Sequence, residues 1–219
     1  MNRKILVIIF CVVLVVAVFE GRFFFRKNIE SPQINKNDIG DWKIYHDNSF
    51  EFKYPGILTL DQQDDKIVLN HFINYHHPNP CDFKGDALQL EKITDFNLSF
   101  KIFDKNLKDT IGISEGSDYI IKNFFQDKNL KTSPGFIDDF SIGTLKGYLI
   151  TSGVEGCGRF AYYFPLSQNT TLVATRAFIP EFQPIIVDYQ TYSNLPGIIS
   201  PNQEEDFFNK ILSSFLIIQ

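Results

Sequence analysis

The sequence lacks the short motifs that mark most enzyme active sites. Its 219 residues contain no Gly-x-Ser-x-Gly elbow, no phosphate-binding loop, no His-Glu-x-x-His helix and no Cys-x-x-Cys knuckle. The glycines of residues 153–158 have the wrong order for a dinucleotide-binding fingerprint, and a tight turn explains them more simply. These absences predict a protein that is not an enzyme and that carries no cofactor.

Positive charge is scarce beyond the first 27 residues. The chain has 21 Lys and Arg against 26 Asp and Glu, a net charge of -5 at pH 7, and residues 1–27 hold five of the basic residues but only one acid. The remainder is therefore more acidic than the chain as a whole. Duplex nucleic acid and anionic lipid headgroups both bind clustered cations, so we expect no nucleic-acid partner and interpret the acidic surface as a source of solubility.

The one long apolar run lies at the N-terminus. Arg3 and Lys4 precede an unbroken apolar segment from Ile5 to Phe19, which as a helix spans about 22 Å of a hydrocarbon core of roughly 30 Å. Phe23–Phe25 at the headgroup level and the flanking cations can make up the difference. We therefore expect residues 1–27 to be a membrane anchor with one transmembrane helix. A cleaved secretory signal, which would leave a secreted protein, is the alternative.

A polar stretch separates this anchor from the rest of the chain. Residues 28–41 contain Pro32 and few large apolar residues, so they bury little surface and are expected to form a tether. The sequence that follows, residues 42–219, has about 180 residues, the size of one domain with a full core. We find no internal repeat and no second linker, and we predict a single globular domain.

The chain has three cysteines, and Cys11 lies within the apolar run. Cys81 and Cys157 are the only pair in the rest of the sequence, and each lies in a turn-rich segment where no regular ladder keeps the sulfurs apart. A disulfide between them suits an oxidising compartment. The basic residues on the two sides of the anchor nearly balance, so the positive-inside rule does not set its orientation. The compartment in which the disulfide forms sets it instead. We expect an extracytoplasmic domain with a Cys81–Cys157 disulfide, and two unrelated buried thiols are the alternative.

Alternation of apolar and polar residues predicts a domain made mostly of strands. Residues 42–45 and Phe50–Tyr54 flank a polar turn and are expected to form a hairpin. Segments rich in β-branched and aromatic residues favour six further strands. These segments are 58–60, 67–73, 98–103, 144–152, 160–164 and 171–178.

Two amphipathic segments predict helices. The first begins near Ser117 and places the apolar residues of 120–125 on one face. The second begins near Asn202, which we expect to cap the helix with Glu205 three residues on. Residues 180–192 are a weaker candidate for a third helix, because Pro184 lies inside the segment.

The order of these elements and several aromatic residues resemble a known family. The residues are Trp42, Tyr45, Phe50, Phe52, Tyr54 and Pro55 at the start of the domain, and 208–215 at its end. They resemble PsbP-like domains, which include uncharacterised membrane-tethered bacterial proteins. The resemblance covers residues 41–218 and implies an α+β fold in which an antiparallel sheet is sandwiched by helices. Photosystem members of the family help retain inorganic ions, and no residue set here carries over that role.

One segment holds most of the possible metal ligands. Imidazole, thiolate and carboxylate groups all bind zinc, but the spacing here matches no known site, and a disulfide at Cys81 would remove a ligand. We commit to no metal site. The candidates, were one present, are His71, His76, His77 and Asp82, with Cys81 and Asp86 nearby. The connection 74–86 is long for a compact domain, and we interpret it as the best candidate for a binding surface.

Three further features are interpreted as structural. Cys157 beside Glu155 would need a neighbouring histidine to act as a thiolate nucleophile. The acidic runs at 61–65 and 138–139 lack the spacing of a calcium loop and are typical of solvated turns. The 23 Phe residues are most simply core.

Together these patterns predict a membrane-tethered, extracytoplasmic binding or assembly module without a catalytic site. Its expected partners are the membrane, through the N-terminal helix, and a protein of the cell envelope. Two alternatives stay open. One is a metal-binding or hydrolytic enzyme that uses residues 71–86, and the other is a structural component of the envelope.

Overall fold

The computed structural model describes residues 41–126, 129–154, 156–183 and 188–218. The predicted anchor and nearly all of the predicted tether lie outside these residues. Within the described ranges, no helix combines the length and the apolar character needed to cross a bilayer.

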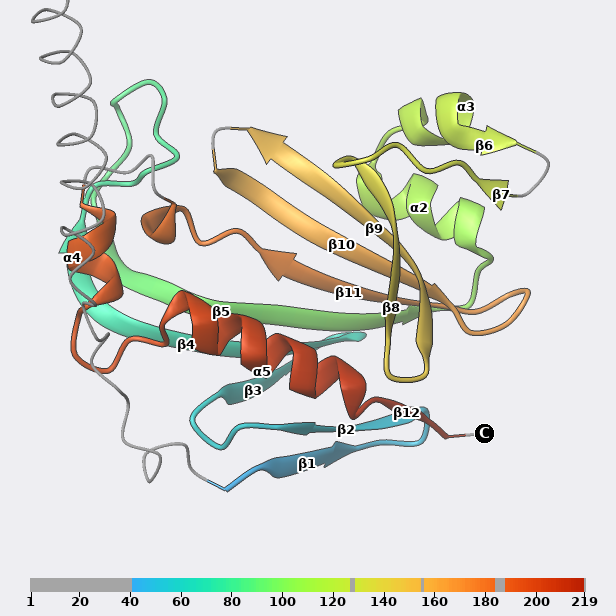
Figure 1. The fold of residues 1–219 in the computed structure, drawn as a ribbon, viewed down its shortest axis with the longest axis horizontal. Coiled ribbons are helices and arrows are strands. Elements are labelled where there is room, and N and C mark those ends of the chain that lie inside the picture. Colours follow the sequence, from blue (N-terminus) through green and yellow to red (C-terminus); the bar gives the residue numbers. More distant parts are fainter. Residues whose placement is uncertain (1–40, 127–128, 155, 184–187, 219) are drawn as a thin grey trace, which may run out of the picture. The chain divides into compact units, whose positions relative to one another are not determined.

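A seven-stranded antiparallel sheet forms the frame of the domain (Figure 1). Its strands lie in the spatial order β3-β4-β5-β11-β10-β9-β8. The strands are β3 (Thr59–Gln63), β4 (Lys66–His77), β5 (Leu90–Phe103), β8 (Ile137–Ile142), β9 (Leu145–Val154), β10 (Cys157–Pro165) and β11 (Thr171–Ala177). The mixed α+β class predicted from the sequence is confirmed.

Smaller elements surround this sheet. The predicted hairpin is present as β1 (Lys43–His46) and β2 (Phe50–Tyr54), and β12 (Leu216–Ile217) pairs with β2. A two-stranded ribbon joins β6 (Phe125–Gln126) to β7 (Asn129–Leu130). The helices are α2 (Leu107–Glu115), α3 (Tyr119–Phe124), the 3-10 helix η1 (Pro180–Phe182), α4 (Tyr189–Ser193) and α5 (Pro201–Ser213).

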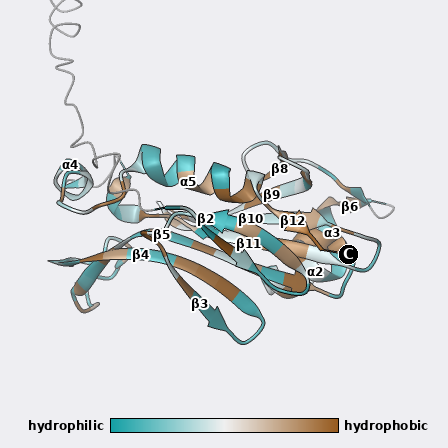
Figure 2. Cartoon of the chain, turned by 90° about the horizontal axis from the view of Figure 1, so that it is seen from below, coloured by the Kyte–Doolittle hydropathy of each residue, from teal (hydrophilic) through white to brown (hydrophobic). Residues whose placement is uncertain are grey.

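The main core lies between the sheet and α5, which runs along one side of the strands (Figure 2). Leu98 and Phe100 of β5 point to this side, and Phe208 of α5 and Phe52 of the hairpin pack in the same cluster. The ring of Phe215 stacks on that of Phe52, with centroids 5.8 Å apart. Aromatic side chains therefore fill this core, as the composition indicates.

A second core lies on the opposite face, under α2 and α3. Tyr163 of β10 and Val173 of β11 alternate with residues of the main core, and they cluster with Ile111 of α2 and Ile120 of α3. Helices thus contact both faces of the sheet, while the β1–β2 hairpin shares one face with α5.

Each predicted strand overlaps an observed one, but β8, the first half of β5, α2 and the two-residue strands β6, β7 and β12 were not predicted. Strand β8 carries two aspartates that obscure its alternation, and the first half of β5 includes the charged pair Glu91 and Lys92. Helix α2 contains Gly112 and β-branched residues, which have low helix propensity. Its ends are nevertheless marked by an Asn106 cap and by Gly116 in the left-handed region, at φ 60°.

The predicted helix boundaries need correction. The first helix begins at Tyr119 and ends at Phe124, so the predicted start near Ser117 is too early. Asn202 is not the cap of α5, because the helix begins at Pro201, and proline is favoured as a first helical residue. Within its described residues, the segment predicted as a weaker helix, 180–192, holds η1 and all of α4 except its last residue, Ser193.

Ser200 takes the capping role at α5. The side-chain oxygen of Gln203 accepts hydrogen bonds from the backbone N–H of Ser200 at 3.0 Å and from its hydroxyl at 2.8 Å. The two residues form a capping box, which satisfies backbone groups that the helix itself leaves unpaired.

This assignment predicts different costs for two neighbouring substitutions. Ser200→Ala should lower the free energy of unfolding by about 1 kcal/mol, because the cap is lost. Asn202→Ala, the matched control at an exposed position, should change it by less than about 0.5 kcal/mol. Urea denaturation of the two variants measures both values. A larger loss for Asn202→Ala would contradict the assignment.

Candidate functional site

Strands β5 and β11 pair over only part of β5. The ladder joins Leu98–Phe103 to Thr171–Arg176, although β5 already begins at Leu90. Beyond Arg176 the chain stays with β10, where the N–H of Phe178 donates to the carbonyl of Gly158 at 2.9 Å. The first half of β5 and the segment 177–181 therefore diverge (Figure 1).

A cleft with a volume of about 550 Å³ lies where they diverge, within the range of ligand-binding pockets. One wall comes from β5 and the other from the segment 177–181, and Asn79 and Pro80 lie at one end. The β5 wall consists of Leu90, Glu91, Lys92, Thr94 and Asn97.

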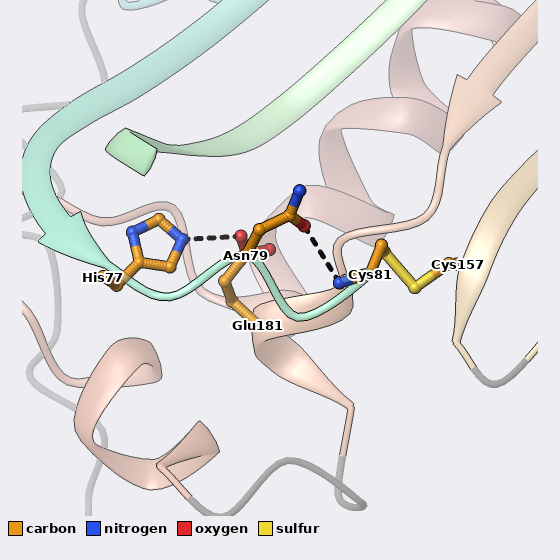
Figure 3. Close-up of a disulfide and its surroundings, with 5 residues drawn as sticks. All are labelled: His77, Asn79, Cys81, Cys157 and Glu181. Atoms are coloured by element: carbon orange, nitrogen blue, oxygen red, sulfur yellow. Dashed lines mark hydrogen bonds and ion pairs between the residues drawn. A yellow bond between two sulfur atoms is a disulfide. The ribbon is translucent and has the colours of Figure 1, made fainter. Parts of the chain in front are cut away.

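Two cross-links join the sides of this cleft (Figure 3). The predicted disulfide is present: Cys81, in the connection after β4, is bonded to Cys157 at the start of β10, with Cα atoms 5.8 Å apart. His77, the last residue of β4, places Nε2 2.9 Å from the carboxylate Oε1 of Glu181 in η1. Each link has one partner on the β4–β5 side and one on the β10–η1 side. Together they fix the separation of the two sides.

The His77–Glu181 pair is shielded from water. Its side chains are 1% and 7% exposed. The second ring nitrogen of His77 lies 3.0 Å from the carbonyl oxygen of Tyr75, so both ring nitrogens face oxygen acceptors. The Tyr192 ring of α4 packs edge-on to the imidazole, with centroids 5.5 Å apart. A buried polar contact of this kind is directional and sets the position of η1 relative to β4.

A third apolar cluster anchors this end of the domain. It brings Ile93 of β5 together with Ile179, Phe182, Tyr192 and Ile198. Because Ile93 points into this cluster, its exposed neighbours Lys92 and Thr94 point to the other side of the strand and line the cleft.

Asp82 organises the connection between β4 and β5. Its carboxylate accepts hydrogen bonds from the backbone N–H groups of Gly85 and Ala87, each at 2.8 Å, and of Lys84 at 3.2 Å. These bonds, that of Ala87 foremost, hold the pKa of Asp82 below its ordinary value. The carboxylate thus fixes the backbone conformation of a segment that has no regular secondary structure.

The same connection presents apolar side chains to solvent. Phe83 is 58% exposed and Leu88 is 89% exposed. The connection extends over residues 78–89, so the predicted range 74–86 needs correction. Residues 74–77 belong to β4, because a register shift lets the strand continue until His77 pairs with Leu90.

The structure does not bring the predicted metal-ligand candidates together. His71 Nδ1 lies 2.7 Å from the carboxylate of Asp95, and His76 is exposed, with Glu91 at 4.0 Å. His77 faces Glu181, Asp82 holds backbone amides, and the sulfur of Cys81 is in a disulfide. Among the residues that the structure describes, no group of three or more His, Cys, Asp or Glu side chains could hold a metal ion.

Two acids of this region were missed by sequence reasoning. Glu181 meets His77 across 104 residues of sequence, and no local pattern signals that contact. Asp95 is the extra residue of a bulge in β5, and its carboxylate accepts hydrogen bonds from His71 and from the N–H of Ile199 at 2.6 Å. The one available signal was that Asp95 interrupts the alternation of apolar residues between Ile93 and Phe96. Cys157, considered as a nucleophile, has its sulfur in the disulfide, and Glu155 lies outside the described residues.

A smaller cavity of about 240 Å³ lies beside the segment 177–179. Arg176 lines it and is hydrogen-bonded to Glu204, with Glu205 at 2.7 Å. Burial raises the pKa of Glu204, although the hydrogen bonds from Arg176 act in the opposite direction. These charges satisfy one another, so the larger cleft is the better candidate for a functional site.

Comparison with known proteins adds no function. The sequence matches no model of a protein family and no curated protein. It is similar to a protein from Bacteroides thetaiotaomicron whose crystal structure was determined at 1.50 Å resolution, with 9% sequence identity and a TM-score of 0.41. The match covers 83% of this chain and 49% of that one, so the chain spans about half the length of that protein.

The His77–Glu181 link predicts unequal costs for two glutamate substitutions. Glu181→Ala should lower the free energy of unfolding by about 1–3 kcal/mol, because a buried ring nitrogen of His77 loses its acceptor. Glu91→Ala removes a carboxylate whose side chain is 78% exposed and should cost less than about 0.5 kcal/mol. Thermal and urea unfolding of both variants provide the measurement. Equal values would show that the link does not stabilise the cleft.

Proposed function

We propose that the chain is a membrane-tethered binding or assembly module, and that its extracytoplasmic domain holds a partner in the cleft between β5 and the segment 177–181. The observation that carries this proposal is the cross-linked cleft itself. A concave site with a fixed width is what a binding module needs, because ordering the site in advance lowers the cost of association.

The disulfide supports the proposed compartment. Bonds of this kind persist in oxidising environments and are rare in the cytosol. Residues 1–27 then serve as a single-pass anchor, 28–41 as its tether and 42–219 as the domain outside the cytoplasm. A cleaved signal would place the domain in the same compartment without the tether, so the binding proposal is the same in either case.

The arrangement of elements also supports the proposed relationship to PsbP-like domains. An antiparallel sheet with α5 on one face and α2 and α3 on the other agrees with a sheet sandwiched by helices. That relationship concerns the fold alone, since fold does not determine function.

The chemistry of the cleft favours binding over catalysis. Cys157 is in the disulfide and His77 is directed at Glu181, so neither is presented to a substrate as a nucleophile or base. The remaining lining combines apolar residues with the polar or charged side chains of Asn79, Glu91, Lys92, Thr94 and Asn97. Apolar walls with a few polar groups are typical of recognition sites.

Photo-crosslinking from two threonines tests this function. The photoreactive amino acid p-benzoylphenylalanine replaces Thr94 in the cleft or, as the matched control, Thr59 on the outer strand β3. Both positions are exposed. In cells that naturally make the full chain, we expect a covalent adduct with a second protein from position 94 and none from position 59. No adduct at either position, or equal adducts at both, would contradict binding in the cleft, and the first result would favour a structural component.

A further inference from the structure

We infer that the occupant of the cleft is an extended polypeptide segment that adds to β5 as a further strand. This inference rests on the proposed binding function and names the class of partner. It follows from the backbone of β5, from the geometry of the cleft and from its charges.

Within the described part of the chain, the edge of β5 that faces the cleft has no strand partner along Leu90–Asn97. These residues pair with β4 on one side, but the ladder with β11 begins only at Leu98. Among the described residues, no backbone hydrogen bond joins this edge to another segment. It is about 26 Å long at 3.3 Å per residue. Unpaired N–H and C=O groups in a row form a template for one more strand.

The cross-links keep this edge available. In an unconstrained sheet β11 could continue along β5 and cover it, but the Cys81–Cys157 bond and the His77–Glu181 pair hold the start of the β4–β5 connection at one end of the cleft. An added strand needs a spacing of about 4.7–4.9 Å from its neighbour. The segment 177–181 forms the wall opposite β5, so the proposed occupant is one strand and not a second sheet.

The charged side chains that commonly block pairing at a strand edge contact other groups here. Lysine side chains on an edge commonly prevent pairing. The ammonium group of Lys92, however, lies 4.1 Å from the centre of the Phe72 ring on β4. Asp95, the bulge residue, directs its carboxylate to His71 and Ile199. Thr94 is exposed between them, and threonine suits a strand that pairs on both sides.

The walls define the chemistry of the segment. The residues opposite β5 are apolar from Ala177 to Pro180, which favours apolar side chains at alternate positions of the partner. Glu181 is paired with His77, whereas Lys92, whose ammonium lies over the Phe72 ring, and Glu91, 4.0 Å from His76, are both exposed, so both signs of charge line the β5 wall. The chain as a whole carries a net charge of -5. This net negative charge favours a strand-forming segment with Lys or Arg residues as the partner.

Peptide selection on the full chain in detergent tests this inference. A library of random short peptides is selected on the unaltered protein and counter-selected on Thr94→Trp, with Thr59→Trp as the matched control. Peptides that bind should be rich in β-branched and aromatic residues at alternate positions, carry Lys or Arg and lack proline. Thr94→Trp should abolish binding, and Thr59→Trp should retain it.

Backbone methylation of a selected peptide gives the decisive readout. In an added strand only every second N–H faces β5. Methylation at those positions should weaken binding by about tenfold each, and methylation at the intervening positions should have little effect. The absence of selected peptides, or a methylation profile without a period of two, overturns strand addition. If either of these results is obtained but the photo-adduct at position 94 still forms, binding in the cleft stands and only strand addition fails. If no adduct forms, both fail.

Discussion

The bond between Cys81 and Cys157 is the constraint on which the candidate site depends. It joins residues separated by 76 positions in the sequence, one in an irregular connection and the other at the start of a central strand. In the chain-entropy model, closing a loop of this size in the unfolded state contributes about 4 kcal/mol to stability. Typical domains have only about 5–15 kcal/mol in total. A connection without its own secondary structure is therefore held against β10 by a single covalent contact.

Where β5 diverges from β11, an apolar cluster lies on one side of the sheet and the cleft on the other. On the α5 side, Ile93, Ile179 and Ile198 form an apolar cluster of their own, which fills the space between the separating segments. On the other side the same divergence leaves the cleft, lined by the residues that alternate with Ile93. The buried contact of His77 with Glu181 then fixes η1 at the end of β4. One change in strand pairing thus accounts for the third cluster, the cleft and the free edge.

The predictions that the structure confirms rest on local spacing of apolar residues or, for the disulfide, on elimination of the other cysteine. The hairpin at Phe50–Tyr54 has a period of two, and α5 has an apolar face that includes Phe207 and Phe208, so both could be predicted from spacing. The disulfide followed because only two cysteines lie outside the apolar run. Turn chemistry misled the prediction of the cap, since Ser200 and Asn202 are both good caps and Pro201 decides between them.

The cleft itself could not be predicted from the sequence. Its formation depends on where the β5–β11 ladder ends, which is set by the contacts of Ile93 and Glu181 with residues about a hundred positions away. Sequence patterns report which face of a strand is buried, but they do not report how far two strands stay paired. The connection after β4 was recognised as a candidate surface because of its length, yet its partner wall at 177–181 carries no such signal.

Peptide mapping by mass spectrometry tests the central claim most directly. The full chain is denatured without reductant, its free thiols are alkylated, and it is digested and analysed. The account predicts a cross-linked pair of peptides that contain Cys81 and Cys157, which separates only after reduction. Recovery of both cysteines as alkylated, unlinked peptides would contradict the constraint that holds the cleft, and with it the placement of the domain outside the cytoplasm.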